Sequence, residues 1–397
     1  MQERAGGDAA SGPSVPGAVA SAPAGAQAGP PEGACAAAGD GGEANQIAQH
    51  GELLFGRYQL AAGPPLGVGG WFVVRRAADV KSRGRSVALK TFNEQAARDL
   101  GSDAVLERFT REVEIFRRLG VGPVQPADAK GDMISPRPDP RRLLVNLLDY
   151  SRRRTGDDEP GPAADGRCYT VLELADEPLD VWLKRRSNAG NFVAASHMQE
   201  VATALADGLA WLHKCGVCHL DIKLENILHF GSAWKLIDLD RPKGLSGAFS
   251  PLYASPELAR FALDETSHAG MEASPAMDMW ATGVVMLDIL VHGSSLEETK
   301  AGFDAAALFD EEDVPFAGWY RWLAETDPLD IDALVPAPAS SVDLLRSADL
   351  REVLGRLLDK DPERRLSARE LRRHAFLSGP GLAARCCAMF RCWRGST

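Results

Sequence analysis

The stretch "KCGVCHLDIKLEN", at positions 214–226, contains two overlapping patterns of residues that could carry out chemistry. The first is C-x-x-C-H, the spacing at which a c-type haem is attached to a chain. The second is H-x-D-x-K-x-x-N, which supplies a carboxylate, a cation and an amide at spacings suited to phosphoryl transfer. The first pattern consists of Cys215, Cys218 and His219, and the second of His219, Asp221, Lys223 and Asn226. Because both use His219, the two interpretations exclude each other in their usual forms.

Phosphoryl transfer from ATP depends mainly on positioning and on charge neutralisation, so the rest of the chain should supply a phosphate cover and a lysine. The stretch "LGVGGWFVV" holds Gly67, Gly69 and Gly70, whose backbone N–H groups could cover phosphates. A Gly-rich hairpin turn is an equally good interpretation of this stretch alone. The stretch "VALK" places Lys90 at the end of a strand, where a lone lysine is normally solvated. Its spacing after the glycines favours a contact with the α- and β-phosphates.

A lysine in this role needs a carboxylate to hold it, and the next predicted helix offers Glu112 and Glu114. Glu112 lies three residues after Phe109 and four before Phe116, so it shares their face of the helix. Glu114 points well away from that face. We therefore predict that Glu112 pairs with Lys90 and that Glu114 is solvated.

The remaining parts of a phosphoryl-transfer site follow in a workable order. Asp221 is the candidate base, and Lys223 is a charge near the transferred phosphate. Asn226 is a candidate metal ligand, and twelve residues later Asp238 ends the β-rich run "KLIDLD". A lone aspartate at a strand end is usually a turn residue, but the pair of Asn226 and Asp238 suits Mg²⁺, with Mn²⁺ as an alternative ion.

The elements that must position these residues change in type along the chain. The predicted strands are "RYQLAAGPPLGVGGWFVVRRAAD", "RSVALKTF", "LLVNLLDYS" and "RCYTVLELA", the first two around the Gly-rich turn. The predicted helices are "DAVLERFTREVEIFRRLG", "SHMQEVATALADGLAWLHKCG", "ASPAMDMWATGVVMLDILVHG", "SADLREVLGRLLDK" and "SARELRRHAFL". The third of these helices is apolar nearly all round, which indicates full burial. Strands first and helices later indicate an α+β chain with two lobes.

At this point the chain resembles the protein kinase superfamily and its Ser/Thr branch, from about Tyr58 to Leu377. "VALK" resembles the strand-three lysine motif, "HLDIKLEN" the catalytic loop, "DLD" the D-F-G motif, "SPE" the A-P-E motif and "DMWATG" a buried helix. The resemblance implies a bilobal fold, with a small β-rich N-lobe and a larger helical C-lobe. It implies an ATP-dependent enzyme that uses Mg²⁺ and phosphorylates Ser or Thr hydroxyls of proteins.

The resemblance also assigns roles to individual residues. Asp221 and Lys223 would be catalytic, and Asn226 and Asp238 would bind metal. Leu172 would be the gatekeeper before an adenine-binding hinge at 173–175. Asp278 would hold the catalytic-loop backbone, Arg365 would pair with Glu257, and Ser250 would touch the base and Lys223. The residues implied to bind the nucleotide are Gly67, Gly69, Val74, Ala88, Lys90, Glu112, Glu173, Ala175 and Leu228. Asp180 and Glu225 lie where relatives that prefer basic substrates place acids, although exposed acids are common in this chain.

Three positions depart from the family pattern. Phe72 replaces the third glycine of the phosphate cover, and we expect a bulky residue there to remain able to cap phosphates. Leu220 replaces the arginine that normally receives an activation-loop phosphate, so control of activity through Ser246 is not expected. Asp240 replaces the D-F-G glycine, where it could repel Asp238 or add a metal ligand. These departures leave a pseudokinase, acting as a nucleotide-binding or scaffolding module, as the alternative to an active kinase.

Composition limits the partners. The formal net charge of -11 argues against a nucleic-acid binder that works through bulk positive charge. The 7 cysteines are scattered and odd in number, which favours a reducing compartment, so we expect a cytoplasmic protein, with the nucleus as an alternative. No apolar run is long enough to span a membrane, and the first residues do not resemble a secretory signal. A c-type haem requires export for its attachment, so this absence also argues against the haem interpretation.

The predicted domain organisation has three parts. Residues 1–52 form a Gly/Ala/Pro-rich tail that we predict to be disordered. Residues 53–377 form the kinase-like domain, divided at 173/174 into two lobes and carrying insertions at 121–142 and 293–342. Residues 378–397 form a tail that contains cysteine and arginine. This tail is compatible with a weak S-acylated membrane anchor, an inert end or a zinc site.

Overall fold

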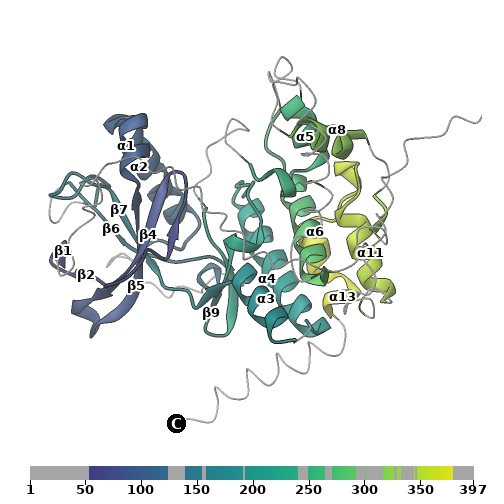
Figure 1. Cartoon of the computed structure of the whole chain (residues 1–397), viewed down its shortest axis with the longest axis horizontal. Helices are drawn as coiled ribbons and strands as arrows, with labels where there is room; N and C mark the ends of the chain where they lie inside the picture. The colour runs from purple at the N-terminus through teal and green to yellow at the C-terminus, as the bar shows by residue number, and fades with distance from the viewer. Residues whose placement is uncertain are drawn as a thin grey trace, which may run out of the picture. The chain divides into compact units, whose positions relative to one another are not determined.

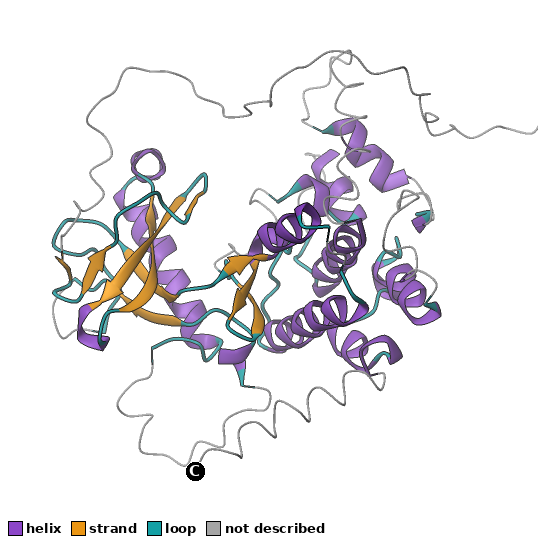
Figure 2. Cartoon of the chain, turned by 60° about the horizontal axis from the view of Figure 1, so that its bottom comes forward, coloured by secondary structure: helices purple, strands orange, loops and turns teal. Residues whose placement is uncertain are grey.

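The structure, a computed structural model, describes residues 53–123, 139–153, 158–190, 193–239, 249–263, 271–291, 300, 316–325, 329–331, 344 and 347–378. The predicted N-terminal tail, Asp240, Ser246 and the chain after Ser378 lie outside these ranges. Within them, a β-rich lobe precedes a helical lobe, so the predicted α+β bilobal fold is confirmed (Figures 1 and 2).

One antiparallel sheet forms the N-lobe, in the order β1-β2-β4-β5-β7-β6, with β3 paired to β4. Its strands are β1 (Leu53–Leu54), β2 (Tyr58–Leu60), β3 (Gly67–Val68), β4 (Phe72–Asp79), β5 (Arg85–Phe92), β6 (Leu147–Tyr150) and β7 (Tyr169–Glu173). Strands β4 and β5 pair along their full length, with Val74 opposite Lys90. Because side chains alternate along a strand, this register places Val74, Ala88 and Lys90 on the same face of the sheet.

The opposite face of this sheet carries its own small hydrophobic core. Its buried members are Leu54, Tyr58, Leu60, Val73, Ala77, Val87, Leu89, Tyr169 and Val171. This core therefore uses the alternate positions of β4, β5 and β7, and it leaves the face with Lys90 free for a site. The apolar alternation in "RSVALKTF" thus separates a structural face from a functional one.

Two helices follow β5, namely α1 (Glu94–Leu100) and α2 (Ser102–Arg118). Helix α2 is the predicted amphipathic helix. It buries Phe109, Val113 and Phe116, and the chain leaves it through Gly120 at φ 75°. That φ favours glycine because a Cβ is strained in the left-handed region. Helix α1 was not predicted, since its seven residues are too few to show a helical period.

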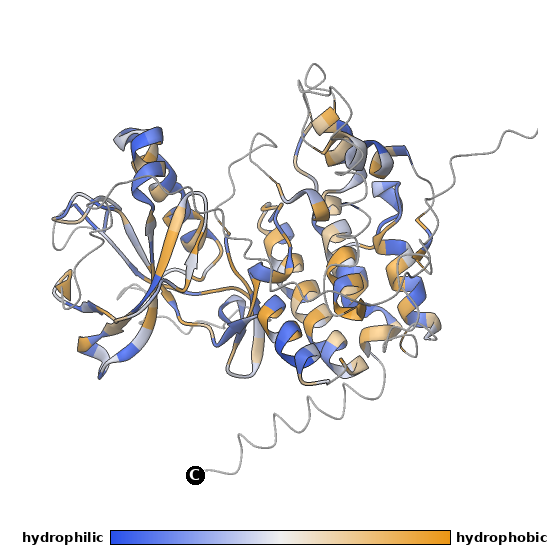
Figure 3. Ribbon diagram, viewed as in Figure 1, coloured by the Kyte–Doolittle hydropathy of each residue, from blue (hydrophilic) through white to orange (hydrophobic). Residues whose placement is uncertain are grey.

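Helices dominate the C-lobe. They are α3 (Leu179–Asn188), α4 (Ala195–Lys214), α5 (Pro256–Leu263), α6 (Pro275–Val291), α8 (Ala317–Glu325), α11 (Ala348–Leu357), α12 (Ala368–Arg373) and α13 (Ala375–Ser378). Every residue of α6 from Met277 to Leu290 is buried, as its all-round apolar pattern predicts (Figure 3). A Cβ on Gly283 would lie 2.8 Å from a methyl carbon of Leu358, so a glycine lets α6 pack closely against the end of α11.

A second, three-stranded sheet lies at the start of the C-lobe and was not predicted as a unit. It consists of β8 (Glu177–Pro178), β9 (Ile227–Phe230) and β10 (Ala233–Leu236), in the order β10-β9-β8. The hairpin of β9 and β10 connects the catalytic-loop stretch to Asp238. It pairs Leu228 with Lys235, and the N–H of Ile237 donates to the carbonyl of Asn226 at 3.0 Å, so Asn226 lies opposite the residue before Asp238.

Two predictions about this domain need correction, and a third stays a prediction. The structure describes only the ends of the insertion predicted at 121–142, where Val121 is fully buried and Pro140 is buried. The irregular stretch predicted at 293–342 contains α8, whose Trp319 and Leu323 are fully buried. "SARELRRHAFL" forms α12 and α13 rather than one helix, because the extended backbone of His374 (φ -61°, ψ 147°) separates them.

Two further findings bear on the predicted cellular context. No helix in the described ranges combines the length and the apolar character needed to cross a membrane. The described cysteines, Cys168, Cys215 and Cys218, are all free thiols.

Candidate active site

Lys90 forms a buried ion pair with Glu112, as the helical spacing predicted. The Nζ atom of Lys90 lies 3.0 Å from Oε1 of Glu112, and the two side chains are 8% and 4% exposed. Glu114 is exposed, again as predicted. Loss of either partner would leave the other as an uncompensated buried charge, so this ion pair couples the position of α2 to that of β5.

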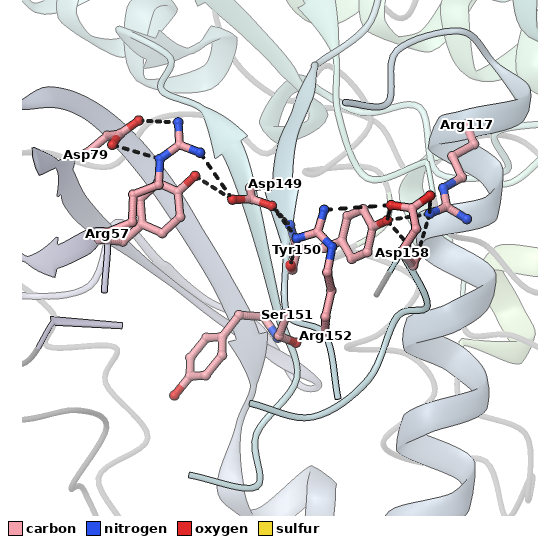
Figure 4. A network of polar contacts seen from close by, with 10 residues as sticks. Arg57, Asp79, Arg117, Asp149, Tyr150, Ser151, Arg152 and Asp158 are labelled. Carbon is pink, nitrogen blue, oxygen red and sulfur yellow. Dashed lines mark hydrogen bonds and ion pairs between the residues drawn. The ribbon is translucent and has the colours of Figure 1, made fainter. Parts of the chain in front are cut away.

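Polar contacts at the C-terminal end of α2 hold this helix against the sheet (Figure 4). Arg117 donates to the hydroxyl of Tyr150 and, at 2.9 Å, to the carboxylate of Asp158. Tyr150 also donates to Asp158 at 2.6 Å. One residue further on, Arg118 donates to the carbonyl of Cys215 in the C-lobe. The helix that carries Glu112 is therefore fastened to both lobes near its end.

Further polar contacts link β2 to the end of β4 and to β6 (Figure 4). Arg57 forms two hydrogen bonds with Asp79, at 2.9 and 2.7 Å, and Tyr58 donates to Asp149 at 2.9 Å. Hydrogen bonding from Arg57 lowers the pKa of Asp79 to about 2. Burial, followed by the charge of Asp149, raises the pKa of Tyr58 well above its usual value. Both groups therefore remain in their hydrogen-bonded ionisation states at neutral pH.

The catalytic-loop backbone is held by Asp278, as predicted. Its carboxylate accepts the N–H groups of His219 at 2.9 Å and of Leu220 at 2.7 Å. Leu220 has φ 62°, which is uncommon for a residue with a Cβ. Asp278 also lies 2.8 Å from Nε2 of His213, a partner that the sequence did not reveal. These bonds stabilise a strained turn directly before Asp221.

His219 is packed inside the C-lobe, where it is 1% exposed. Its Nε2 donates to the carbonyl of Ile237 at 2.8 Å, and its Nδ1 accepts the N–H of Asp221 at 3.3 Å. Burial, together with the charge of Asp278, raises the pKa of Cys218 to about 12. Since both ring nitrogens are engaged and this thiol stays protonated, the pattern C-x-x-C-H serves packing here rather than haem attachment.

The carboxylate of Asp221 is buried and receives hydrogen bonds from three sides. Ser250 donates to Oδ1 at 2.9 Å, Asn226 donates to Oδ2 at 3.0 Å, and Nζ of Lys223 lies 2.9 Å from Oδ2. Ser250 also accepts a hydrogen bond from Lys223 at 3.2 Å, so it touches both residues as predicted. These three donors fix the orientation of the carboxylate.

The residues predicted to bind metal can hold Mg²⁺. The amide nitrogen of Asn226 donates to Asp221, which leaves the amide oxygen as the group available to a cation. Asp238 has φ 60°, its side chain is 33% exposed, and its Oδ1 lies 3.4 Å from Nζ of Lys90. The described residues contain no cluster of three His, Cys, Asp or Glu side chains suited to a metal. One amide and one carboxylate nevertheless fit Mg²⁺, which keeps water and phosphate oxygens as its other ligands.

Four of the apolar residues predicted to contact the nucleotide share an unusual environment. Ala88 is buried and the other three are half-buried, yet none belongs to either hydrophobic core. They are Val74, Ala88, Ala175 and Leu228. The N–H group of Ala175 donates to no acceptor among the described residues. Shielded apolar side chains beside an unused backbone donor are typical of a ligand site that binds a flat heterocycle.

Glu173 lies at the predicted hinge, but its carboxylate serves the protein itself. Its Oε1 accepts from the N–H and the amide of Asn146, at 2.9 and 2.6 Å, and from Lys235 at 2.5 Å. One carboxylate oxygen of Glu173 is thus engaged within the protein, and the predicted contact of Glu173 with a nucleotide stays a prediction. Sequence reasoning missed Asn146 and Lys235, because a single polar residue between apolar ones gives no sign of its partner.

Gly67, Gly69 and Gly70 lie in β3 and in the turn that leads to β4, which both interpretations of this stretch predict. None of them has a positive φ, and a Cβ on Gly67 or Gly70 would meet no protein atom within 4 Å. Protein packing therefore does not explain these glycines, whereas the approach of a ligand would. The ring of Phe72 packs on Phe92 at 4.6 Å and lies 3.9 Å from Nζ of Lys90, and its expected role as a cap on phosphates stays a prediction.

Two polar contacts fix the stretch that follows Ser250 to the C-lobe. Arg365 forms a buried bidentate pair with Glu257, at 2.5 and 2.7 Å, as predicted. Tyr253 donates to the buried Asp288 on α6 at 2.9 Å, a contact that was not predicted. Both link the stretch after Ser250 to the C-lobe core.

Comparison with known proteins decides the family. A family model described as "Protein kinase domain" matches residues 144–377, which is more than half of the chain. The chain belongs to the protein kinase family. The resemblance inferred from the motifs is thereby confirmed. The match begins at Leu144, so the predicted start of the kinase domain at residue 53 stays a prediction.

Individual relatives place this kinase with the serine/threonine branch. It is 27% identical to testis-specific serine/threonine-protein kinase 3 of Homo sapiens over 338 residues, which cover 82% of this chain and 98% of that protein. It is 26% identical to the Aurora kinase of Schizosaccharomyces pombe over 336 residues, which cover 82% and 73%. It is 25% identical to cell division control protein 2 homolog 3 of Trypanosoma brucei brucei over 333 residues, which cover 79% and 90%.

Proposed function

We propose that this kinase is active and transfers the γ-phosphoryl group of ATP to serine or threonine hydroxyls of proteins. One observation carries the proposal. Asp221 is fixed by Ser250, Asn226 and Lys223, while Lys90 contacts both Glu112 and Asp238 at 3.0 and 3.4 Å. All charged groups that phosphoryl transfer requires are thus assembled together.

The proposed reaction is an in-line displacement at phosphorus. The oxygen of the substrate hydroxyl forms a bond to the γ-phosphorus, and the bond from that phosphorus to the β–γ bridging oxygen breaks, so ADP leaves with its electron pair. The hydroxyl proton passes to the carboxylate of Asp221. Lys223 lies 2.9 Å from that carboxylate, so its charge also lies near the phosphoryl group in transfer.

Binding of the nucleotide would use the face of the sheet that carries Lys90. Val74, Ala88 and Leu228 would enclose the adenine, and the N–H of Ala175 would donate to it. Lys90, oriented by Glu112, would contact the α- and β-phosphates. Asn226 and Asp238 would hold Mg²⁺, which when bound would neutralise phosphate charge.

The protein substrate would be basic near the phosphorylated residue. Glu225 is exposed one residue before Asn226. Asp180 pairs at 3.2 Å with Lys184, whose side chain is 71% exposed, and a substrate arginine could replace that exposed partner. This preference can be measured by comparing peptides with arginine, neutral and acidic residues around one serine.

The proposal is tested by incubating the purified full chain with radiolabelled ATP, with and without Mg²⁺, and with generic basic and acidic protein substrates. Mg²⁺-dependent label on serine or threonine supports it. A thermal shift with ATP but no transfer to any acceptor would show the pseudokinase alternative instead.

The C-terminal tail and the cellular location remain separate proposals. We propose a cytoplasmic protein whose residues 378–397 weakly associate with membranes after S-acylation. The test is fractionation of cells that express the full chain or a version lacking 379–397, with thioester cleavage by hydroxylamine. Membrane association that is unchanged in the truncated version would contradict the anchor.

A further inference from the structure

Asn93 follows the last residue of β5 and lies three positions after Lys90. Its amide nitrogen donates to the carbonyl oxygens of Gly70 at 2.5 Å and of Gly69 at 3.2 Å. Its backbone N–H donates to the carbonyl of Trp71 at 2.9 Å. One residue thus binds three consecutive carbonyl oxygens at the tip of the phosphate cover.

The other side of Asn93 is used as well. Its side-chain oxygen accepts the N–H of Ala96 at 2.7 Å and so caps the N-terminus of α1. The amide is therefore held at both ends, with the oxygen on α1 and the nitrogen on the cover. These bonds also fix which end of the amide carries the nitrogen, because only that end can donate to carbonyls.

The hydrogen bonds from Asn93 bear on phosphate binding because they determine which backbone groups of the tip remain available to a phosphate. A carbonyl oxygen repels an anion, whereas a backbone N–H attracts one. Within the described ranges, the N–H groups of Gly70 and Trp71 donate to no protein acceptor. The tip therefore has its three acceptors satisfied on one side and two donors left for a ligand.

Neighbouring side chains contact Trp71 and Phe72 but not the two glycines of the tip. The ring of Phe72 packs on Phe92, and the guanidinium of Arg108 lies 5.3 Å from the centre of the Trp71 ring. Gly69 and Gly70 have no side chains with which to pack. The described contacts that fix their peptide planes are those of Asn93, together with a bond from the N–H of Gly69 to the carbonyl of Phe72 at 2.8 Å.

We propose that Asn93 is a positioning residue for the phosphate cover, which orients the tip so that its free N–H groups face the phosphates of ATP. The inference rests on the proposed function, since it assumes that this cover binds a nucleotide. A tip that is already ordered loses less conformational entropy when ATP binds, so the contribution appears in affinity for phosphate-bearing ligands. Adenosine, which has no phosphates, gains nothing from it.

Two substitutions separate the contact with the cover from the cap of α1. In Asn93→Ser the hydroxyl can still cap α1 but is too short to reach Gly69 and Gly70. In Asn93→Asp the carboxylate also caps α1 but cannot donate to carbonyls. Gln95→Ala is the matched control, because Gln95 is an exposed residue of α1 that contacts Asp99 and not the cover.

The experiment measures dissociation constants by calorimetry for the β,γ-imido analogue of ATP with Mg²⁺ and, separately, for adenosine. We expect Asn93→Ser and Asn93→Asp to weaken the analogue about fivefold or more, the usual effect of losing one such hydrogen bond, and to leave adenosine unchanged. Gln95→Ala should change neither constant. Equal loss for both ligands, or loss for neither, would overturn the proposal.

Hydrogen exchange of the turn at 66–72 gives an answer that does not depend on nucleotide binding. Faster exchange of the Gly69 N–H, which donates to the carbonyl of Phe72, in Asn93→Ser but not in Gln95→Ala supports the positioning role, and unchanged exchange refutes it. If the unmodified chain binds neither ligand, nucleotide binding itself is refuted, and this exchange measurement then decides the role of Asn93 alone.

Discussion

The N–H group of Leu220 donates to the carboxylate of Asp278 at 2.7 Å, at the position where the kinase motif pattern implies an arginine. This bond and the neighbouring one to His219 fix the catalytic loop from the buried helix α6. The side chain of Leu220 packs against the core and borders a small cavity with Phe249, Tyr253 and Met277. The catalytic loop is thus held by the C-lobe core, and Leu220 supplies no charge that could bind a phosphate on the activation loop.

We predict that phosphatase treatment leaves the transfer rate of the kinase unchanged. The reason is that Leu220 cannot pair with a phosphate, whereas an arginine can. Leu220→Arg should not increase the rate, and it should lower stability by on the order of 1–3 kcal/mol, because the new charge faces apolar neighbours. Rate assays and urea unfolding check both statements. A large loss of activity after phosphatase treatment would contradict the first.

Ser250 should affect catalysis more than stability. Ser250→Ala removes the donor to Asp221 and the acceptor for Lys223, so we expect the turnover rate at saturating ATP to fall about tenfold. Ser250→Thr keeps the hydroxyl and should retain most of the rate. Equal loss in both variants would show that packing, rather than the hydroxyl, matters at this position.

The fastening of α2 can be tested at Arg117. Arg117→Ala removes the contacts to Tyr150 and Asp158, and we expect it to lower stability by about 1–2 kcal/mol and to raise KM for ATP, since Glu112 lies on the same helix. Arg111→Ala is the control, because Arg111 pairs only with the exposed Glu107 among the described contacts of its side chain. Thermal unfolding and ATP titration provide the readouts. Identical behaviour of the two variants would remove the special role of Arg117.

The pair of Arg57 and Asp79 predicts a pH dependence of stability in acid. The pKa of Asp79 is lowered from 3.8 to about 2, so its contribution is fully present above pH 3.8 and is lost as the pH falls toward 2. We expect it to be on the order of 1–2 kcal/mol, since Arg57 is partly exposed to solvent. Urea unfolding of the unmodified chain and of Asp79→Asn should therefore converge as the pH falls from 4.5 to 2.5. A difference that widens over this range would refute the assignment.

Much of this site was predictable because its residues lie at short, fixed spacings. The helical period alone selected Glu112 over Glu114, and the loop spacing placed Asp221, Lys223 and Asn226 together. Contacts between residues far apart in the sequence were harder to predict. His213, Asn146 and Lys235 form polar contacts across the fold, and nothing in the flanking sequence marks their partners. Helix α8 was missed for a related reason. It packs against α5, and Trp319 donates to the carbonyl of Pro251, so its contacts come from distant parts of the sequence.

The most direct test of the central claim compares phosphate transfer by the unmodified kinase with that of Asp221→Asn. The substitution preserves shape but removes the proton acceptor, so transfer should fall by about a hundredfold or more while binding of ATP persists. Asp103→Asn, which changes an exposed residue in the first turn of α2, should transfer at the unmodified rate. Transfer by Asp221→Asn at the rate of the unmodified kinase, or no transfer by the unmodified kinase, would contradict the proposal that this chain is an active kinase with Asp221 as its base.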